Sequence, residues 1–215
     1  MRLTRLLVFA AALFSLALWA APSVAQVRPG EDFTVLSPPQ ATEPGKVEVI
    51  EFFSYACGHC YRLEPFLEAW AKRLPPDVVF RRVPGVGSEQ WSALAQLFYA
   101  LEAMNQLDRL HPKIFSALHE QNQNLASAKV RDAWLAANGV DAQQYAAVEK
   151  SFAVQSKLSR ARQLMAAYKV DGVPMLVVNG KYVTSSAKAG GPERVIPLIE
   201  RLIAQARVES GIGKK

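Results

Sequence analysis

A pair of cysteines constrains this fold more than any other feature, because it stands where a strand gives way to a helix. Residues 47–54 are almost continuously apolar, which is typical of a strand buried on both faces. Residues 61–73 predict a helix that is broken or kinked at Pro65, and residues 77–83 predict a second strand. A strand, a helix and a strand in this order favour a parallel pair joined by a right-handed crossover. The chain is therefore expected to form an α/β fold around this unit.

Cys57 and Cys60 are the only cysteines among the 215 residues, and Gly58 and His59 separate them. A disulfide that closes so small a ring adds little stability, so the pair is interpreted as a redox dithiol rather than a structural bridge. Cys57 is expected at the amino terminus of the helix, where free N–H groups and the helix dipole favour a thiolate. It is predicted to be the nucleophile, with Cys60 one turn further as the resolving thiol. His59 is predicted to stabilise the thiolate.

Two other interpretations of the cysteine pair are half of a zinc site and an inert bridge. A zinc site needs further ligands, yet the chain has no second cysteine pair, and His111 and His119 have no ligand-like spacing to the first. We therefore expect no metal and no cofactor beyond the dithiol itself. The two histidines are interpreted as surface or helix-end residues.

The first 25 residues have the pattern of a secretory signal peptide. Arg2 and Arg5 precede an apolar run at residues 6–21, and small residues at 23–25 favour cleavage after Ala25. An uncleaved anchor helix is the alternative, although this run is short for a membrane span. Cleavage would lower the formal net charge from +6 to +4, because both arginines leave and no acidic residue does. Acidic residues are interspersed with the remaining basic ones, which argues against nucleic-acid binding.

The rest of the chain divides into a long helical stretch and a second part that forms strands. Residues 32–36 predict a short edge strand, and Asn179-Gly180 between two apolar runs predicts a hairpin with a type I′ turn. Helical patterns are expected at 107–120, 130–137, 142–152 and 153–169. We predict a signal peptide at 1–25, an α/β domain at 26–87 and 170–209, an all-helical insertion at 88–169 and a mobile tail at 210–215.

Two further residues have an open interpretation. If Glu51 points into the core, it is a buried carboxyl group that can accept the proton of Cys60; if it points outward, it is a surface residue. A strand buried on both faces does not reveal which of the two holds. Pro174 follows Val173 directly before an apolar strand, and the residues alone leave open whether its peptide bond is cis.

Residues 51–61, with the Cys57–Cys60 pair, together with Val173-Pro174 and the strand-turn segment 178–182, carry a family resemblance. They resemble the DsbA family of periplasmic thiol:disulfide oxidoreductases. The resemblance covers nearly all of the chain after residue 25. It implies a thioredoxin-like fold, a central mixed sheet flanked by helices, with an inserted all-helical subdomain.

The resemblance also implies roles and partners. Pro174 would be cis and face the dithiol, and Val173 would offer its backbone to an extended substrate peptide. Glu51 would be the buried acid of a proton relay, and Glu64 a further charge near it. The protein would be a monomeric periplasmic oxidase that donates its disulfide to newly exported proteins. A quinone-linked membrane enzyme similar to DsbB would re-oxidise it.

Two departures from the family pattern and two rival functions stay open. The dipeptide is Gly-His, as in protein disulfide isomerases, where many DsbA relatives have Pro-His, and this leaves the redox potential open. The lysine that often accompanies the buried acid has no clear match, although Arg81 and Arg82 lie in the corresponding strand. An isomerase or reductase is the first alternative, and periplasmic isomerases usually carry a dimerisation domain ahead of the fold. A chaperone that binds peptides is the second.

Overall fold

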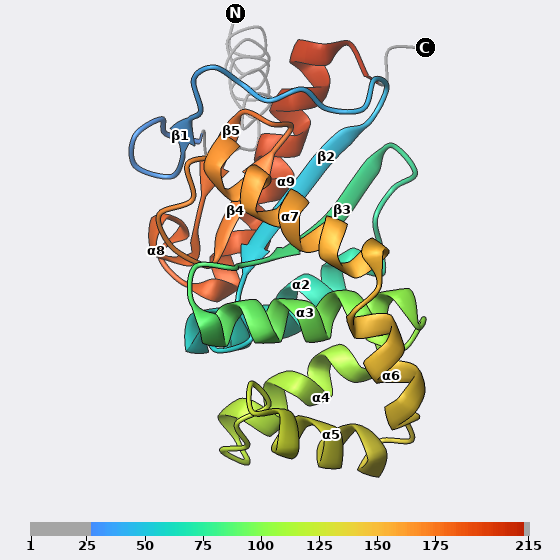
Figure 1. Ribbon diagram of the computed structural model, residues 1–215. Coiled ribbons are helices and arrows are strands. Elements are labelled where there is room, and N and C mark those ends of the chain that lie inside the picture. Colours follow the sequence, from blue (N-terminus) through green and yellow to red (C-terminus); the bar gives the residue numbers. More distant parts are fainter. Residues whose placement is uncertain (1–26, 213–215) are drawn as a thin grey trace, which may run out of the picture.

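The computed structural model describes residues 27–212, which form a mixed β-sheet with helices on both faces (Figure 1). The strands are β1 (Thr34–Val35), β2 (Val47–Phe53), β3 (Val78–Pro84), β4 (Met175–Val178) and β5 (Tyr182–Thr184). They follow the order β1-β5-β4-β2-β3 across the sheet. Strands β2 and β3 run parallel, whereas β4 is antiparallel to β2 and β5, and β1 is antiparallel to β5. The predicted α/β class is confirmed.

The cysteine pair belongs to a β2–α2–β3 unit at the centre of the sheet. Every residue of β2 except Glu48 is buried, as its apolar sequence predicts. Helix α2 (Gly58–Ala71) connects β2 to β3, in which Val78 pairs with Val47. Of the two predicted possibilities at Pro65, a break is wrong, because α2 continues past this residue, and a kink stays a prediction. Pro65 is exposed, so solvent can satisfy the carbonyl group that loses its N–H donor.

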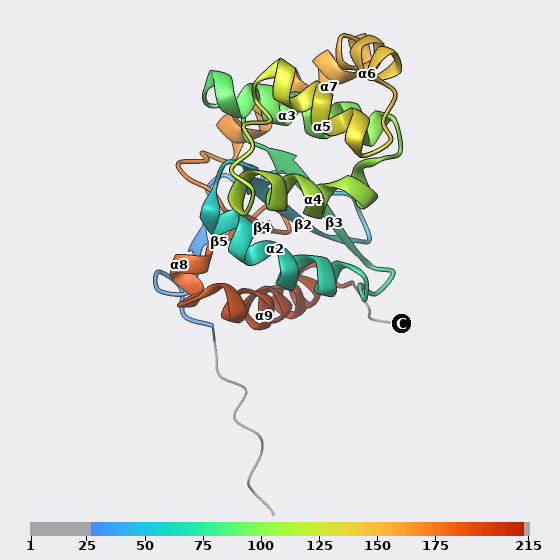
Figure 2. The ribbon, with the colours of Figure 1, turned by 90° about the horizontal axis from the view of Figure 1, so that it is seen from below.

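Two apolar cores hold helices against the two faces of the sheet (Figure 2). Neighbouring residues of β2 point to opposite faces: Val49 belongs to the core beneath α2 and α9 (Pro192–Ser210), and Ile50 to the core on the other face. The last helix packs through the apolar stripe that its sequence predicts. This stripe consists of Val195, Leu198, Ile199, Leu202 and Ile203. Each face of β2 is thus covered, which explains its lack of polar alternation.

Five helices stand between β3 and β4, and no strand interrupts them in this part of the described chain. They are α3 (Glu89–Ala103), α4 (Leu107–His119), α5 (Ala128–Ala137), α6 (Ala142–Glu149) and α7 (Phe152–Ala167). Asp141 caps α6 by accepting a backbone N–H of the first turn, as predicted. The helix predicted over 142–152 ends at Glu149 instead. Ser151 accepts the N–H of Val154 and so begins a new helix, α7.

The hairpin between β4 and β5 turns at Asn179 and Gly180, as predicted. Both residues have positive φ, 51° and 65°, which is the requirement of a type I′ turn. The loop before β2 packs closely on this turn, since the backbone N–H of Gln40 donates to the carbonyl oxygen of Gly180 (N···O 2.9 Å). The turn therefore needs glycine for its backbone angle and for the space beside it.

Replacing Gly180 by alanine is expected to lower the free energy of unfolding by about 2–4 kcal/mol, through left-handed strain and steric overlap. An added Cβ would lie 2.2 Å from the backbone oxygen of Gln40. Gly139 is the matched control: its φ is +73°, but no atom lies within 4 Å of an added Cβ. Gly139→Ala should therefore cost only about 1 kcal/mol. Urea unfolding of both variants measures the difference, and equal losses would contradict the close packing at Gly180.

Two predictions concern the ends of the chain. The predicted signal peptide, 1–25, lies outside the described residues. The predicted tail, 210–215, begins inside α9, whose last residue is Ser210, and Ile212 packs against the core beneath that helix. None of the helices within residues 27–212 has the length and apolar character that a membrane span requires.

Candidate active site

The structure places the two cysteines differently with respect to solvent. Cys57 immediately precedes α2, and its carbonyl oxygen accepts the N–H of Tyr61 in the first turn (N···O 3.0 Å). Cys57 is half-buried, whereas Cys60 lies one turn inside the helix and is fully buried. Both are free thiols. A substrate sulfur can therefore reach Cys57 but not Cys60.

The Cys57 sulfur is surrounded by hydrogen-bond donors. The hydrogen bond from the Cys60 thiol has the largest effect and lowers the pKa of Cys57, while burial opposes it. The backbone N–H groups of Cys60 and His59 and the charge of His59 lower it further, to about 5. Burial has the reverse effect on Cys60, whose pKa rises, and the hydrogen bond to Cys57 raises it further. At neutral pH the site thus holds one thiolate and one thiol.

The two residues between the cysteines, Gly58 and His59, both lie near the side chain of Arg62. His59 is exposed, and its Nδ1 lies 2.9 Å from Nη2 of Arg62, one turn further along α2. A Cβ added at Gly58 would meet Nη1 of Arg62 at 3.6 Å, an ordinary contact. Space alone therefore does not require glycine at position 58.

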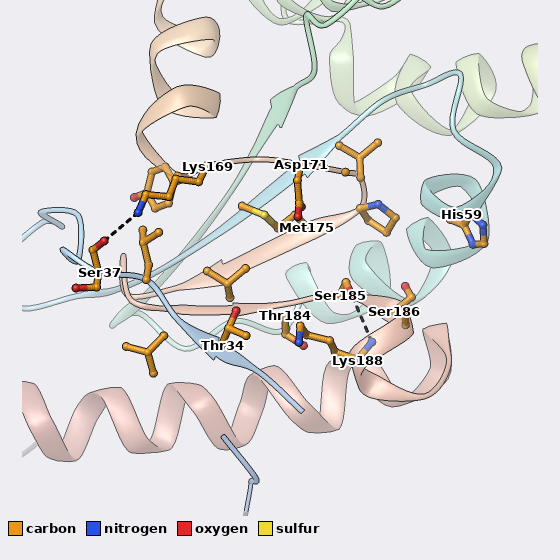
Figure 3. Close-up of a pocket in the computed structure, with 18 residues that line it drawn as sticks. Thr34, Ser37, His59, Lys169, Asp171, Met175, Thr184, Ser185, Ser186 and Lys188 are labelled. Atoms are coloured by element: carbon orange, nitrogen blue, oxygen red, sulfur yellow. Dashed lines mark hydrogen bonds between the residues drawn. The ribbon is translucent and has the colours of Figure 1, made fainter. Parts of the chain in front are cut away.

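The loop before β4 contacts the half-buried Cys57. The Val173–Pro174 peptide bond is cis, and the carbonyl oxygen of Val173 lies 3.4 Å from Sγ of Cys57. A groove of about 750 Å³ runs from this loop along β5 and β1 (Figure 3). His59 lies at one end, and Ser37, whose carbonyl oxygen accepts a hydrogen bond from Lys169, lies at the other. The groove thus opens beside the thiolate.

Glu51 points into the core on the α2 side, which answers the question that its sequence left open. Its side chain is 1% exposed, and neither carboxyl oxygen has a hydrogen-bond partner among the described residues. Burial raises the pKa of Glu51 to about 8; Arg82 opposes this shift, while Glu64 and Cys57 add to it. A carboxyl group with this pKa exchanges protons near neutral pH.

Arg82 takes the place at which a lysine partner of the buried acid was sought in the sequence. Glu51 and Arg82 are direct neighbours in the β2–β3 register. Nε of Arg82 lies 3.4 Å from Oε2 of Glu51, and its Nη2 donates to Oε1 of Glu64 at 2.6 Å. Arg81 points elsewhere and pairs with Glu48. One guanidinium therefore faces both buried carboxyl groups.

The interpretation of His111 as a surface or helix-end residue is wrong. It is 5% exposed, and its Nδ1 lies 2.6 Å from the hydroxyl oxygen of Tyr55, two residues before Cys57. His119 is half-buried at the end of α4, and its Nε2 lies 2.7 Å from the carbonyl oxygen of Tyr55. The sequence contains a signal for His111, since it shares the apolar face of α4 with Leu110 and Ile114. Helix α4 thus brings both histidines to the cysteine motif.

Comparison with known proteins shows the family to which the chain belongs. A family model described as a DSBA-like thioredoxin domain matches residues 67–192. The chain is 40% identical over 206 residues to the thiol:disulfide interchange protein DsbA of Bordetella parapertussis, covering 95% of this chain and 97% of the relative. The chain belongs to the DsbA family. Its similarity to the DsbA of Azotobacter vinelandii is 43% identity over 165 residues, or 77% of either chain.

Solved DsbA structures share the fold. The crystal structure of Pseudomonas aeruginosa DsbA matches with a TM-score of 0.82 and 37% sequence identity, over 86% of this chain and 97% of that one. The predicted thioredoxin-like fold with a helical subdomain is thereby confirmed. As a DsbA-family member, the protein is an enzyme, a thiol:disulfide oxidoreductase. Within residues 27–212 no group of three potential ligand side chains is placed to hold a metal ion.

Proposed function

We propose that this DsbA-family protein works as a dithiol oxidase on newly exported proteins. A substrate thiolate attacks Sγ of Cys57 in the Cys57–Cys60 disulfide, which breaks that bond and forms a mixed disulfide at Cys57. A second substrate thiolate then attacks the substrate sulfur of the mixed disulfide. The substrate leaves with a disulfide, and two electrons stay on the enzyme as the Cys57 thiolate and the Cys60 thiol.

The stabilised thiolate of Cys57 is the observation that carries this proposal. The thiol of Cys60 and two backbone N–H groups reach the Cys57 sulfur when it is reduced. Each pKa unit by which it falls below the ambient pH favours the reduced form by about 1.4 kcal/mol, or about 30 mV for two electrons. With a pKa of about 5, the effect near pH 7 is about 60 mV toward an oxidant. Because the reduced form is favoured, the protein is expected to give its disulfide to a substrate rather than to reduce one.

The groove beside Pro174 is proposed to hold the substrate. Its lining includes His59 and Val173, and the carbonyl oxygen of Val173 lies 3.4 Å from the reacting sulfur. An extended segment placed there would pair with the loop backbone as an added strand, which recognises main chain rather than a particular sequence. Such binding suits unfolded exported proteins of varied sequence.

Re-oxidation is proposed to need a membrane partner similar to DsbB, linked to quinones. Cys57 attacks a disulfide of that partner, and Cys60 then attacks Sγ of Cys57 to regenerate the enzyme disulfide and release the partner's thiolate. We propose that Glu51, whose charge acts on the buried Cys60 thiol, accepts the proton that Cys60 loses. We propose that the protein acts as a monomer in the periplasm after loss of residues 1–25, with its own disulfide as the only redox group.

Equilibration with glutathione tests the direction of exchange. The oxidised and reduced protein fractions, separated after acid quench and alkylation, are measured across a series of glutathione redox ratios. The proposal expects the protein to be half-reduced at a potential well above the roughly −270 mV of thioredoxin. A potential close to that of thioredoxin would support the reductase alternative instead.

A further inference from the structure

One partly buried arginine, Arg82, lies beside two buried carboxyl groups near the cysteines. The side chains of Glu51 and Glu64 are 1% and 5% exposed, and that of Arg82 is 19% exposed. The hydrogen bond of Arg82 goes to Glu64, while Glu51 is left with a 3.4 Å ion pair and no hydrogen bond from the described residues. A buried carboxylate needs such partners, so the two groups compete for Arg82.

His111 contacts the carboxyl oxygen for which Arg82 is the donor. Its Nε2 lies 3.3 Å from Oε1 of Glu64. On its other side, Nδ1 lies 2.6 Å from the hydroxyl oxygen of Tyr55, whose pKa is raised by burial, so this hydroxyl keeps its proton. In the tautomer in which Tyr55 donates to Nδ1, the ring proton of neutral His111 is on Nε2, the nitrogen that lies near Glu64. Nε2 makes no hydrogen bond to a described residue, so its 3.3 Å approach to Glu64 is a polar contact beside that of Arg82.

We propose that His111 is a positioning residue for the step in which Cys60 attacks. In this proposal the Nε2–H of His111 partly balances the charge of Glu64, so that Glu64 attracts Arg82 less strongly. Arg82 can then also stabilise the Glu51 carboxylate, the form that accepts a proton. Without His111, Arg82 is drawn to Glu64, and Glu51 stays protonated up to a higher pH.

This inference rests on the proposed function, and its proton and electron balance is that of the resolving step. Cys60 gives its proton to the Glu51 carboxylate, and its sulfur attacks Sγ of Cys57 in a mixed disulfide. The Cys57–Cys60 bond forms, the mixed disulfide breaks, and the departing thiolate takes the electron pair. The rate of this step follows the fraction of Glu51 that is ionised.

The charged groups around this cluster come from every element packed on it. Tyr55 faces His111 from the loop before α2, Glu64 and Glu68 face it from α2, and Arg82 faces it from β3. Burial lowers the pKa of His111, so near neutral pH it acts mainly as a neutral donor. The titrating group in the proposed step is thus Glu51, which is next to Cys57, Cys60, Glu64 and Arg82.

Stopped-flow reaction of the reduced protein with 5,5′-dithiobis(2-nitrobenzoate) between pH 5 and 9 tests the proposal. A first coloured thiolate leaves when Cys57 attacks, in a phase that depends on reagent concentration. A second leaves when Cys60 attacks the mixed disulfide, in a phase that does not. Loss of either phase in the unaltered protein would overturn the proposed roles of the cysteines, separately from the inference on His111.

Replacing His111 should change the pH at which the rate of the second phase is half of its maximum, here called the midpoint. His111→Phe removes the donor but fits the surrounding aromatic rings; we expect the midpoint to rise by about half to one unit, with a rate about three to ten times lower at pH 7. His111→Gln retains a donor and should restore most of the rate. His119→Phe is the matched control, since His119 contacts Tyr55, Tyr61 and Phe115, and should leave the midpoint unchanged.

A double-mutant cycle separates positioning from a general structural effect. Glu64→Gln removes the competing carboxylate, so the midpoint should fall, and adding His111→Phe to this variant should move it no further. The Glu64→Gln result stands even if His111→Phe does not fold. An unchanged midpoint in His111→Phe, or an equal shift with and without Glu64, would overturn the proposal.

Discussion

Replacing Cys57 by serine is expected to abolish oxidation of a reduced dithiol peptide. Cys57 is the one cysteine that a substrate can reach, because Cys60 is fully buried beneath the first turn of α2. Serine has no sulfur with which to form a mixed disulfide, so the exchange has no first step. Turnover of a fluorescent dithiol peptide, with glutathione disulfide as the terminal oxidant, measures the loss.

Cys60→Ser is the matched control for this experiment. It leaves the Cys57 sulfur in place, so Cys57 should still attack a disulfide and accumulate as a mixed disulfide that mass spectrometry detects. Neither variant should turn over, but only Cys60→Ser should trap a partner. Retained turnover in Cys57→Ser, or trapping by Cys60 in that variant, would contradict the assigned order of the two thiols.

The reduced protein is expected to be more stable than the oxidised protein at neutral pH, and this difference should disappear in acid. The pKa of Cys57 is about 5 in the folded protein against a reference value of 9.0. A group whose folded pKa is lowered adds stability that is complete above the unfolded pKa and is lost as the pH falls through the folded pKa. The added stability therefore grows between pH 5 and 9.

The expected size follows from the distance between neutral pH and the folded pKa. Two pKa units correspond to about 2.7 kcal/mol, which solvent screening of the half-exposed sulfur reduces to about 2 kcal/mol at pH 7. Urea unfolding of both redox forms at pH 7 and pH 4.5 measures it. The exposed carboxyl groups titrate in both forms, whereas the pKa of Glu51 also responds to the charge of Cys57. The difference between the forms therefore reports the Cys57 thiolate together with its effect on Glu51. A difference that did not depend on pH would show that the thiolate is not its source.

The local elements of the fold could be predicted from neighbouring residues. The apolar run before Cys57, the helix after it and the strand at 77–83 reveal the β2–α2–β3 unit, because period and capping act over a few residues. Asn179-Gly180 reveals its hairpin for the same reason. The exact helix limits were less accessible: the helix predicted to end at residue 152 ends at Glu149, and Ser151 caps the next helix.

The charged groups near the cysteines, Glu51, Glu64 and Arg82, could not be placed together in this way. A strand buried on both faces has no alternation of apolar and polar residues, so its sequence does not reveal which face each side chain points to. Only the packed sheet shows that Glu51 points toward α2. Arg82 meets Glu51 because of the β2–β3 register, and it meets Glu64 because α2 crosses that pair of strands. A partner defined by register and crossing has no signature in the spacing of residues.

The sequence by itself determined that this protein has a dithiol at the start of a helix in an α/β fold, since both properties depend on residues close together in the chain. Only the tertiary structure decided what surrounds the dithiol. Val173 lies 116 positions after Cys57, and His111 lies 56 positions after Tyr55. Such contacts form when separate elements pack against one sheet, and burial there sets the pKa values on which thiol exchange depends.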